Sequence, residues 1–425
     1  MNILLKKVRI KTLFSRFEPI KVEPLELCYL KTVADEMGNN SYIIDELFNN
    51  GIPTNEEGNP LSPDIIVLTG YNVAENEILK EAQNYKLEYP NVKIIIGGVH
   101  IQLNSSSFHK PYIDYVIHSQ SLEVFKIILR ICSGENLDVL GFDYIKNEQW
   151  IIGDKDIIFE NEDIIPDREL FSNIRNQVYY LDKREVALIK GSVGCPYSCS
   201  YCYCKELNGG KYLNADYEKM VREMSSIDSK YFWIVDDVLL INNADALSFI
   251  DEVKKAKLDR KFIAYLRADF IIKHKDLIPE LKEVGLNEVI IGFEAINEEE
   301  LKNYNKTTSA VDYPKVISIL KENDLDFTAL FMVHPSYEIK DFINLSRFIK
   351  KHKIDIFTLS IFTPIKGTIG YEDEKNLIRN DPKYFDFLHL VTKSNLPKFI
   401  FYLLFYGLHL RLLKSKRIWK YILRR

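Results

Sequence analysis

Short apolar segments alternate with helical patterns along most of this chain of 425 residues, and that alternation constrains the fold more than any other feature. Strands interspersed with helices form parallel sheets covered on both faces, which bind ligands beyond the carboxyl ends of their strands. In the N-terminal third, the pattern predicts strands at Ile3–Ile10, Ser41–Ile44, Asp64–Leu68, Val92–Ile96 and Tyr112–Ile117, and helices at Pro24–Met37, Glu75–Tyr89 and Val124–Cys132. Ligand-binding loops are therefore expected at Thr69–Asn72 and Gly97–His100.

The alternation resumes after an irregular stretch, Leu140–Lys183, in which a β-hairpin is expected around Ile145–Ile152. Six further strands are predicted at Val186–Ile189, Tyr231–Val235, Lys261–Tyr265, Glu288–Ile291, Phe327–Met332 and Ile356–Ile361, with helices such as Asp216–Ser226, Ala244–Lys255 and Asp276–Val284 between them. Six strand–helix units fit a partial or complete β/α barrel, whose chemistry lies at the C-terminal ends of its strands.

Composition restricts the class of protein. A chain with 46% hydrophobic residues is not disordered, and a net charge of -5 gives no reason to expect nucleic-acid binding. Four of the six cysteines lie between Cys195 and Cys204, which favours metal or redox chemistry in a reducing compartment. No secretory leader pattern is visible, and the apolar run Phe399–Leu410 is well short of the ~20 residues that cross a bilayer. We therefore expect a cytoplasmic protein.

The C-terminal segment differs from the rest in charge. Phe387–Arg425 contains nine Lys and Arg residues and no Asp or Glu. One interpretation is a helix that packs on the barrel with a basic outer face. The other is an interfacial helix that is attracted to anionic lipid or to an acidic partner. The sequence leaves both open.

Cys195, Cys199 and Cys202 form a CxxxCxxC array soon after the predicted strand Val186–Ile189. Three thiolates on one loop can hold three irons of a cubane cluster and leave the fourth iron open for another ligand. The alternative is structural zinc, which takes four closed ligands, usually in two separated pairs. Cys204 would then be the fourth ligand, but the spacing is too crowded for a usual zinc site. Otherwise, Cys204 is an apolar contact or a reactive thiol.

The CxxxCxxC array, with Tyr201 before its last cysteine, resembles the signature of the radical S-adenosylmethionine (SAM) enzymes. The order of further phrases is similar to the cobalamin-binding branch of that family, the class B methyltransferase-like enzymes. These phrases are PLELCYLKTVADEMG, KIIIGGVH, WIVDDVLLIN, YLRADFI, IGFEAINEEELKNYNK and TPIKGT.

The resemblance implies an α/β fold with four parts. Residues 1–140 would form a Rossmann-like (flavodoxin-like) cobalamin-binding domain, and residues 141–184 a linker with the hairpin. Residues 185–375 would form a radical SAM partial β/α (TIM-like) barrel, and residues 376–425 a small basic helical segment.

The resemblance also implies three cofactors: a 4Fe–4S cluster on the three cysteines, SAM chelated to the open iron, and cobalamin. The SAM contacts would be Tyr201, Asp236, Arg267 and Glu294, and the cobalamin contacts Thr69, Gly70, Gly97, Gly98 and Val99. Three alternatives stay open. Arg267 and Glu294 would form a structural ion pair at the rim of the barrel, or Asp237 would contact the ligand in place of Asp236. The glycines would form an ordinary strand–helix turn. No catalytic residue is assigned.

The chain departs from the family pattern in three places. It lacks the DxHxxG phrase that supplies a histidine to cobalt in other cobalamin proteins, and a lone His100 is more typical of a hydrogen-bonding loop residue. His118–Ser121 replaces an acidic GExE-like phrase, and Met332–Glu338 replaces a Gly-rich phrase of the barrel. The ligand below cobalt and the substrate pocket are therefore not assigned.

The implied activity is radical methylation of an unactivated carbon of a small-molecule, peptide or lipid substrate, with methylcobalamin as the methyl source. Low-potential electrons would come from a flavodoxin or ferredoxin, and the basic tail allows peripheral membrane contact. The alternatives are a radical rearrangement, ring formation or oxidation without methyl transfer, and a non-catalytic metal- or corrinoid-binding protein.

Overall fold

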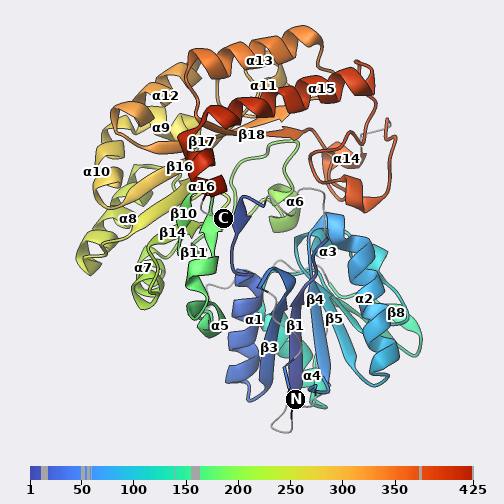
Figure 1. Cartoon of the computed structure of the whole chain (residues 1–425). Coiled ribbons are helices and arrows are strands. Elements are labelled where there is room, and N and C mark those ends of the chain that lie inside the picture. Colours follow the sequence, from blue (N-terminus) through green and yellow to red (C-terminus); the bar gives the residue numbers. More distant parts are fainter. Residues whose placement is uncertain are drawn as a thin grey trace. The chain divides into compact units, whose positions relative to one another are not determined.

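The computed structural model describes residues 1–10, 18–48, 53–54, 58, 60–138, 140–154, 163–372 and 376–423. The chain divides into two compact units (Figure 1). The first comprises Met1–Phe17, Pro24–Phe171 and Asp381–Phe385, and the second Glu18–Glu23, Ser172–Asn380 and Asp386–Arg425.

The first unit is built on a mainly parallel sheet. Its strand order is β3 (Asn40–Asp45), β1 (Asn2–Lys7), β4 (Ile65–Thr69), β5 (Lys93–Gly97), β6 (Tyr115–Ile117), β7 (Phe142–Lys146) and β8 (Gln149–Ile151). The first five strands are parallel, in the order typical of flavodoxin-like sheets, whose ligands bind where the strand order reverses, here between β1 and β4. β7 and β8 pair antiparallel and form the predicted hairpin.

Helices cover this sheet because its strands are apolar on both faces. They are α1 (Leu25–Glu36), α2 (Glu75–Glu88), α3 (Val99–Leu103) and α4 (Leu122–Cys132). α1 packs against α4, whereas α2 and α3 share a hydrophobic cluster with alternate residues of β4 and β5. α4 begins after Ser121, whose hydroxyl accepts a hydrogen bond from the backbone N–H of Glu123 (3.1 Å), as helix-capping serines do.

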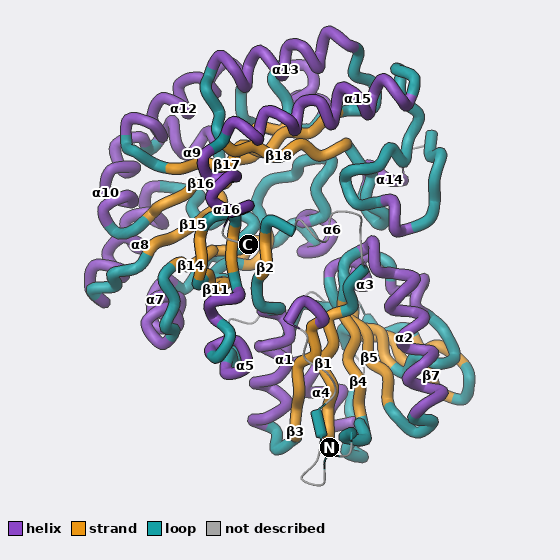
Figure 2. Tube along the Cα trace, viewed as in Figure 1, coloured by secondary structure: helices purple, strands orange, loops and turns teal. Residues whose placement is uncertain are grey.

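Six parallel strands form the second unit's main sheet (Figure 2). Their order is β11 (Val186–Ile189), β14 (Tyr231–Ile234), β15 (Lys261–Tyr265), β16 (Leu286–Glu294), β17 (Asp326–Val333) and β18 (Ile356–Ile361). The helices between them are α7 (Tyr217–Ser226), α8 (Asn243–Ala256), α9 (Ala268–Lys273), α10 (Ile278–Glu283), α11 (Glu298–Asn303), α12 (Tyr313–Glu322) and α13 (Ile339–Lys351). Six successive parallel strand–helix units make the partial barrel that the sequence predicts.

The shorter elements of the chain surround these frameworks. β12 (Val193–Gly194) and β13 (Tyr212–Leu213) form a hairpin, and β2 (Ile20–Lys21), β9 (Tyr179–Tyr180) and β10 (Lys183–Arg184) form a small sheet. The remaining α-helices are α5 (Glu169–Ser172), α6 (Cys204–Asn208), α14 (Ile369–Glu372), α15 (Lys398–His409) and α16 (Lys416–Leu423).

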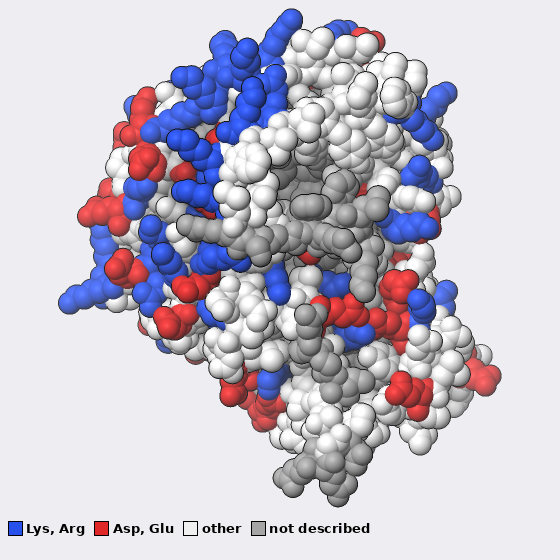
Figure 3. Space-filling view, in the orientation of Figure 1, with Lys and Arg blue, Asp and Glu red and all other residues white. Residues whose placement is uncertain are grey.

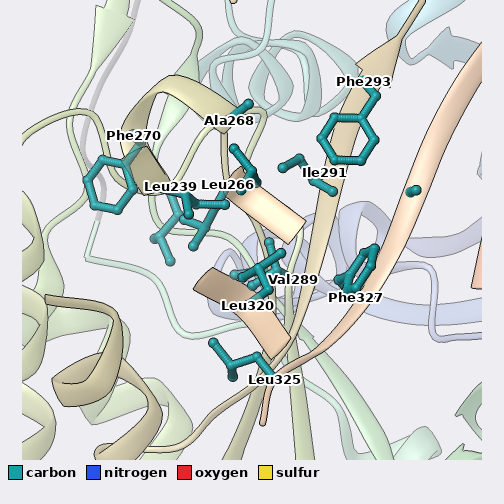
Figure 4. Packing of buried hydrophobic residues seen from close by; sticks show 14 of the residues in the cluster. Leu239, Leu266, Ala268, Phe270, Val289, Ile291, Phe293, Leu320, Leu325 and Phe327 are labelled. Atoms are coloured by element: carbon teal, nitrogen blue, oxygen red, sulfur yellow. The ribbon is translucent and has the colours of Figure 1, made fainter. Parts of the chain in front are cut away.

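Strand β16 shows how the barrel separates its core from its interior. Val289, Ile291 and Phe293 belong to the buried cluster that also contains Leu320 of α12 (Figure 4). The intervening residues, Ile290, Gly292 and Glu294, line a cavity instead. Because successive side chains of a strand point to opposite faces, one strand both closes the core and builds the site.

The tail packs into the second unit. Phe401 and Phe405 of α15 are fully buried in its main hydrophobic cluster, and Leu408 is nearly so. Arg417 of α16 forms an ion pair with the buried Glu288 at the start of β16 (2.7 Å). One face of the tail is therefore part of the barrel's fold. No helix in the described part of the chain is long and apolar enough to cross a membrane.

Candidate active site

The cysteine array lies on the loop between β12 and α6, and its thiols line a cavity of about 240 Å³ in the second unit. The same cavity is lined by residues from the carboxyl ends of β15 and β16, including Arg267 and Glu294. Parallel barrels carry their chemistry at these strand ends. Of the residues predicted to hold the cluster and SAM, Cys195, Cys199, Cys202, Tyr201, Arg267 and Glu294 all meet at this cavity.

The turn after α11 anchors the cysteine loop. Ser200 donates its backbone N–H to the Tyr304 carbonyl (2.9 Å) and its hydroxyl to the Asn303 carbonyl (3.2 Å). Asn305 donates its side-chain amide to the carbonyl of Ser198 (2.8 Å). At the loop's start, Gly194 has φ +81°, and a Cβ there would collide with the Lys211 carbonyl oxygen. Loop conformation is thus fixed from both sides.

The thiols are held in unlike environments. Burial raises the pKa of the Cys195 thiol to about 11. A hydrogen bond from Cys204 lowers the pKa of Cys202, and the same bond raises the pKa of Cys204, which is buried. A cluster needs thiolates, and Cys204 supports that state at Cys202 as a hydrogen-bond donor.

The thiols fit a cubane cluster. The described residues hold no three His, Cys, Asp or Glu side chains arranged around one metal ion. Three cysteines of a cubane cluster each bind a different iron, so they need not converge on one point. Cys195, Cys199 and Cys202 are all half-buried and share the cavity wall.

Arg267 is the second residue after the end of β15, and its side chain contacts three partners. It forms a two-point ion pair with Asp269 (Nε–Oδ1 3.0 Å, Nη2–Oδ2 2.8 Å) and donates to the Thr307 hydroxyl (2.6 Å). Its guanidinium lies 3.5 Å from the centre of the Tyr197 ring. Burial lowers the pKa of Arg267, but the hydrogen bond and the negative charge of Asp269, with smaller contributions from Tyr197 and Cys199, together outweigh it and the pKa rises. A fixed cation therefore borders the cavity.

Glu294 ends β16 at a bulge and forms an ion pair with Lys306 (3.1 Å). Lys306 also donates to the Tyr201 hydroxyl (3.5 Å), and this tyrosine ring meets Tyr304 edge to face. The cavity thus presents Glu294 as an anion, with Lys306 and Arg267 as cations. That charge pattern fits the ammonium and carboxylate groups of an amino acid such as the methionyl part of SAM.

The two aspartates after β14 have different surroundings. Asp236 is 1% exposed, and its carboxylate accepts the backbone N–H groups of Gly191 (2.7 Å) and Ser192 (2.8 Å). Burial raises the pKa of Asp236, although these contacts oppose the rise. Asp237 is exposed and lines the cavity. The sequence left the two aspartates as alternatives, and this geometry favours Asp237 for ligand contact and Asp236 for holding the loop before β12.

Three site residues were not foreseen from the sequence: Lys306, Thr307 and Tyr197. Tyr197 lies inside the cysteine array, and the other two lie in the NYNKTT turn after α11. The available signal was the polar composition of that turn, since Lys306 is the last residue of the phrase IGFEAINEEELKNYNK. A turn has no periodicity that shows where its side chains point, so the sequence pattern does not indicate that these residues reach the site.

In the first unit, the predicted cobalamin contacts lie on two neighbouring strand ends. Thr69 ends β4 and pairs with Gly97, which ends β5. Gly70, Gly98 and Val99 follow directly. Gly98 has φ +119°, and a Cβ there would lie 2.6 Å from the Thr69 hydroxyl oxygen, whereas a Cβ at Gly97 meets only ordinary contacts. Gly98 therefore allows the loop after β5 to approach Thr69 closely, which a residue with a side chain would prevent.

The histidines of this unit form hydrogen bonds with other residues of the same unit. His100 is buried, with Nε2 2.6 Å from a Glu75 carboxylate oxygen and Nδ1 3.3 Å from the Asn104 amide. This arrangement matches the expected hydrogen-bonding role. His118 and His109 both contact the buried carboxylate of Asp143 (3.1 and 2.8 Å).

Comparison with known proteins identifies the barrel. Residues 189–349 match the model of the radical SAM superfamily. That match, the partial barrel and the cysteine loop together define a radical SAM domain, and the predicted family resemblance is confirmed. Residues 189–349 therefore form a radical SAM domain, and the enzymes of that superfamily use a 4Fe–4S cluster and SAM.

Three relatives share limited identity with the chain. It is 22% identical to hopanoid C-3 methylase of Methylococcus capsulatus, over 90% of this chain and 75% of that protein. It is 29% identical to bacteriochlorophyllide d C-8(2)-methyltransferase of Chlorobaculum tepidum, over 48% of each chain. It is 24% identical to the anaerobic magnesium-protoporphyrin IX monomethyl ester cyclase of Cereibacter sphaeroides, over 80% of this chain and 57% of that protein. The chain thus spans only about half the length of the last two.

Two solved structures share the fold. The cobalamin-dependent SAM radical enzyme OxsB, with aqua-cobalamin and SAM bound, matches with a TM-score of 0.69 and 15% identity over 93% of this chain and 64% of that one. The radical SAM methyltransferase TsrM from Kitasatospora setae, with cobalamin and a 4Fe–4S cluster bound, matches with a TM-score of 0.63 and 13% identity over 86% and 74%. These likenesses confirm the predicted fold class.

Proposed function

We propose that this protein is a cobalamin-dependent radical SAM enzyme that methylates an unactivated carbon of a small-molecule, peptide or lipid substrate. The observation that carries the proposal is the meeting of three cysteine thiols, Arg267 and Glu294 at one cavity on the carboxyl side of a parallel partial barrel. The cluster would supply the electron that cleaves SAM to methionine and a 5′-deoxyadenosyl radical. Cobalamin would supply the methyl group.

The chain's own residues would bind and orient these groups. Cys195, Cys199 and Cys202 would hold three irons. Glu294 would accept hydrogen bonds from the SAM ammonium, and Arg267 or Lys306 would bind its carboxylate. Tyr201 would pack beside the nucleotide, because its ring already lines the cavity. A fixed set of charges favours one ligand orientation.

For cobalamin, we propose the cradle of Thr69, Gly70, Gly97, Gly98 and Val99. Its support is that Thr69 and Gly70 lie at the end of β4, which borders the point where the strand order reverses, and that Gly98 lets the two loops approach closely. Gly98→Ala should weaken cobalamin binding at least ~10-fold, since the methyl group meets Thr69. The matched control is Gly134→Ala, which has a similar φ of +100° but no neighbour within 4 Å. Equal loss of binding in both variants would contradict the cradle.

The test of the reaction uses protein prepared anaerobically, with iron, sulfide and cobalamin measured first. With SAM, a strong reductant and a substrate, methyl transfer predicts 5′-deoxyadenosine, S-adenosylhomocysteine and a product heavier by one CH2 unit. Cys195→Ala should reduce iron content and 5′-deoxyadenosine release to background. Normal SAM cleavage by that variant would overturn the cluster assignment.

A second candidate, radical cyclisation or oxidation without methyl transfer, is favoured by the similarity to the cyclase of Cereibacter sphaeroides. It predicts 5′-deoxyadenosine without a gain of CH2. Bound iron or corrinoid with no SAM cleavage would instead indicate a non-catalytic binding protein. The electron donor, by this proposal, is a low-potential flavodoxin or ferredoxin.

A further inference from the structure

Helix α15 is apolar on two opposite faces. Its inner face, Phe401, Phe405 and Leu408, is buried in the core of the second unit. Its outer face carries Phe399 (77% exposed), Leu403 (61%) and Tyr406 (38%), and Leu410 (65%) follows directly after the helix. Their spacings of four, three and four residues place them in one stripe. A helix that only packed on the barrel would carry polar residues there.

The stripe continues into a wider surface. Leu413 and Trp419, further along the tail, are each 47% exposed. We call these six residues, Phe399, Leu403, Tyr406, Leu410, Leu413 and Trp419, the outer tail face. Helix α13 lies beside α15, because the rings of Phe342 and Phe401 pack 5.4 Å apart. It adds exposed Ile339 and Ile343. Exposed apolar side chains gathered on neighbouring elements in this way mark a docking site.

Basic side chains accompany this apolar surface. Lys398, Lys414, Lys416 and Lys420 are exposed on the tail, and Arg347, Lys350 and Lys351 on the later turns of α13. Figure 3 shows blue side chains gathered beside white surface where α13 and α15 lie in Figure 1. The acids of α13, Glu338 and Asp341, form that helix's capping box. Residues 387–425 contain no acid at all.

We propose that the outer tail face docks the protein on the surface of an anionic lipid bilayer. Aromatic and leucine side chains would enter the boundary between headgroups and acyl chains, while the lysines reach the lipid phosphates. The basic charge disfavours a second copy of the same face, because like charges would meet. The depth of insertion is interfacial, since no described helix is long enough to span a membrane. This inference does not depend on the proposed reaction.

The experiment is vesicle cosedimentation of the full chain under anaerobic conditions. Wild-type protein should bind phosphatidylcholine–phosphatidylglycerol vesicles at least ~10-fold more tightly than pure phosphatidylcholine, and salt should weaken binding, because each surface Lys contributes about a factor of five. Lys398→Glu/Lys414→Glu/Lys420→Glu should lose at least ~10-fold in affinity. The matched control is Lys257→Glu/Lys273→Glu/Lys275→Glu, exposed lysines on other helices and turns, which should bind as the wild type does.

A second variant separates apolar insertion from charge. Phe399→Ser/Leu403→Ser/Leu410→Ser should also lose at least ~10-fold in vesicle affinity and keep the wild-type melting temperature, because these side chains are exposed. Three outcomes would overturn the proposal: no wild-type binding to anionic vesicles, equal binding by the charge-reversed variant, or a concentration-dependent dimer that the serine variant abolishes without vesicle binding.

Discussion

Glu294 owes its position to an unusual backbone conformation. Its φ of +63° lies in the left-handed region, which costs a side-chain-bearing residue roughly 1–2 kcal/mol. A bulge next to Glu294 turns its carboxylate towards Lys306. The carboxylate then lies beside Gly292, where a Cβ would collide with it. Strain of this kind persists at sites where the surrounding structure compensates for it. The ion pair with Lys306 is one such compensation.

Glu294→Gln should weaken SAM binding by about 10- to 100-fold, because a hydrogen bond to a charged group contributes roughly 1.5–3 kcal/mol. Equilibrium binding of SAM to the reconstituted protein measures the loss. Glu299→Gln, an exposed position on the neighbouring helix α11, is the control and should bind normally. If both variants bind SAM equally well, the ion pair at Glu294 is only structural.

Substitutions of the two adjacent aspartates should distinguish an effect on stability from an effect on ligand binding. Asp236→Asn should lower stability by about 1–3 kcal/mol, since an amide cannot accept both backbone N–H groups as the carboxylate does. Asp237→Asn should leave the melting temperature unchanged and weaken ligand binding. Thermal melting and SAM titration of both variants distinguish these effects. If Asp236→Asn weakened SAM binding and Asp237→Asn lowered the melting temperature, Asp236 would be the residue that contacts the ligand.

The sequence located those site residues that follow predictable strands. Arg267 and Glu294 come at the ends of strands whose apolar runs are easy to recognise. Lys306 escaped because it reaches the cavity from a turn. The choice between Asp236 and Asp237 depended on the backbone of Gly191 and Ser192, which lies 44 to 45 residues away in the chain.

At the scale of elements, strand positions were the most predictable feature. β11, β15 and β18 have the expected bounds, because each is a short and mainly apolar segment. β16 extends from Leu286 to Glu294, beyond the expected Glu288–Ile291, because the bulge and the glycine interrupt the apolar pattern without ending the pairing. Strand order is set by packing between elements, and the sequence showed it only through the family resemblance.

Asp143 joins several elements of the first unit. Its buried carboxylate contacts His109 and His118 and accepts the backbone N–H of Gly153 (3.2 Å). Burial raises the pKa of Asp143. The hydrogen bonds from the two histidines, helped by the charge of His118 and the Gly153 N–H, lower it by more, so the pKa is below its usual value. The stabilisation is therefore present at neutral pH and is lost as pH falls through the lowered pKa.

Asp143→Asn should destabilise this unit by about 2–4 kcal/mol at pH 7, because the histidines lose a charged acceptor. The difference from wild type should shrink below about pH 4, where the wild-type carboxylate also becomes protonated. Denaturant unfolding of both proteins at several pH values measures it. A difference that stays constant down to pH 3 would show that packing, not charge, stabilises this contact.

At the scale of the whole molecule, Arg417 of the tail helps to neutralise a buried acidic residue of the barrel, Glu288. Glu288 is fully buried at the start of β16 and is paired with Lys183 (2.5 Å) and Arg417 (2.7 Å). Arg417 also contacts Asp182 (2.9 Å). The sequence indicated a basic tail, but it did not show that one of its arginines enters the barrel, since the buried partner lies 129 residues earlier.

Arg417→Met should lower the free energy of unfolding by about 3–5 kcal/mol, because the buried Glu288 then keeps Lys183 but loses the guanidinium that binds it at two points. Lys416→Met, at the exposed neighbouring position, should change stability by less than about 0.5 kcal/mol. Thermal and denaturant unfolding of both variants provide the measurement. Similar values for the two would show that Lys183 alone neutralises Glu288.

The Arg417–Glu288 pair also sets an order of events during protein synthesis. A ribosome adding roughly 5–20 residues per second needs about 6–26 seconds to travel from Glu288 to Arg417. During that interval the nascent barrel lacks both its arginine partner and the phenylalanines of α15. The cysteine loop emerges earlier still, so its thiols leave the ribosome before the segment that completes the buried ion pair and the core of the barrel.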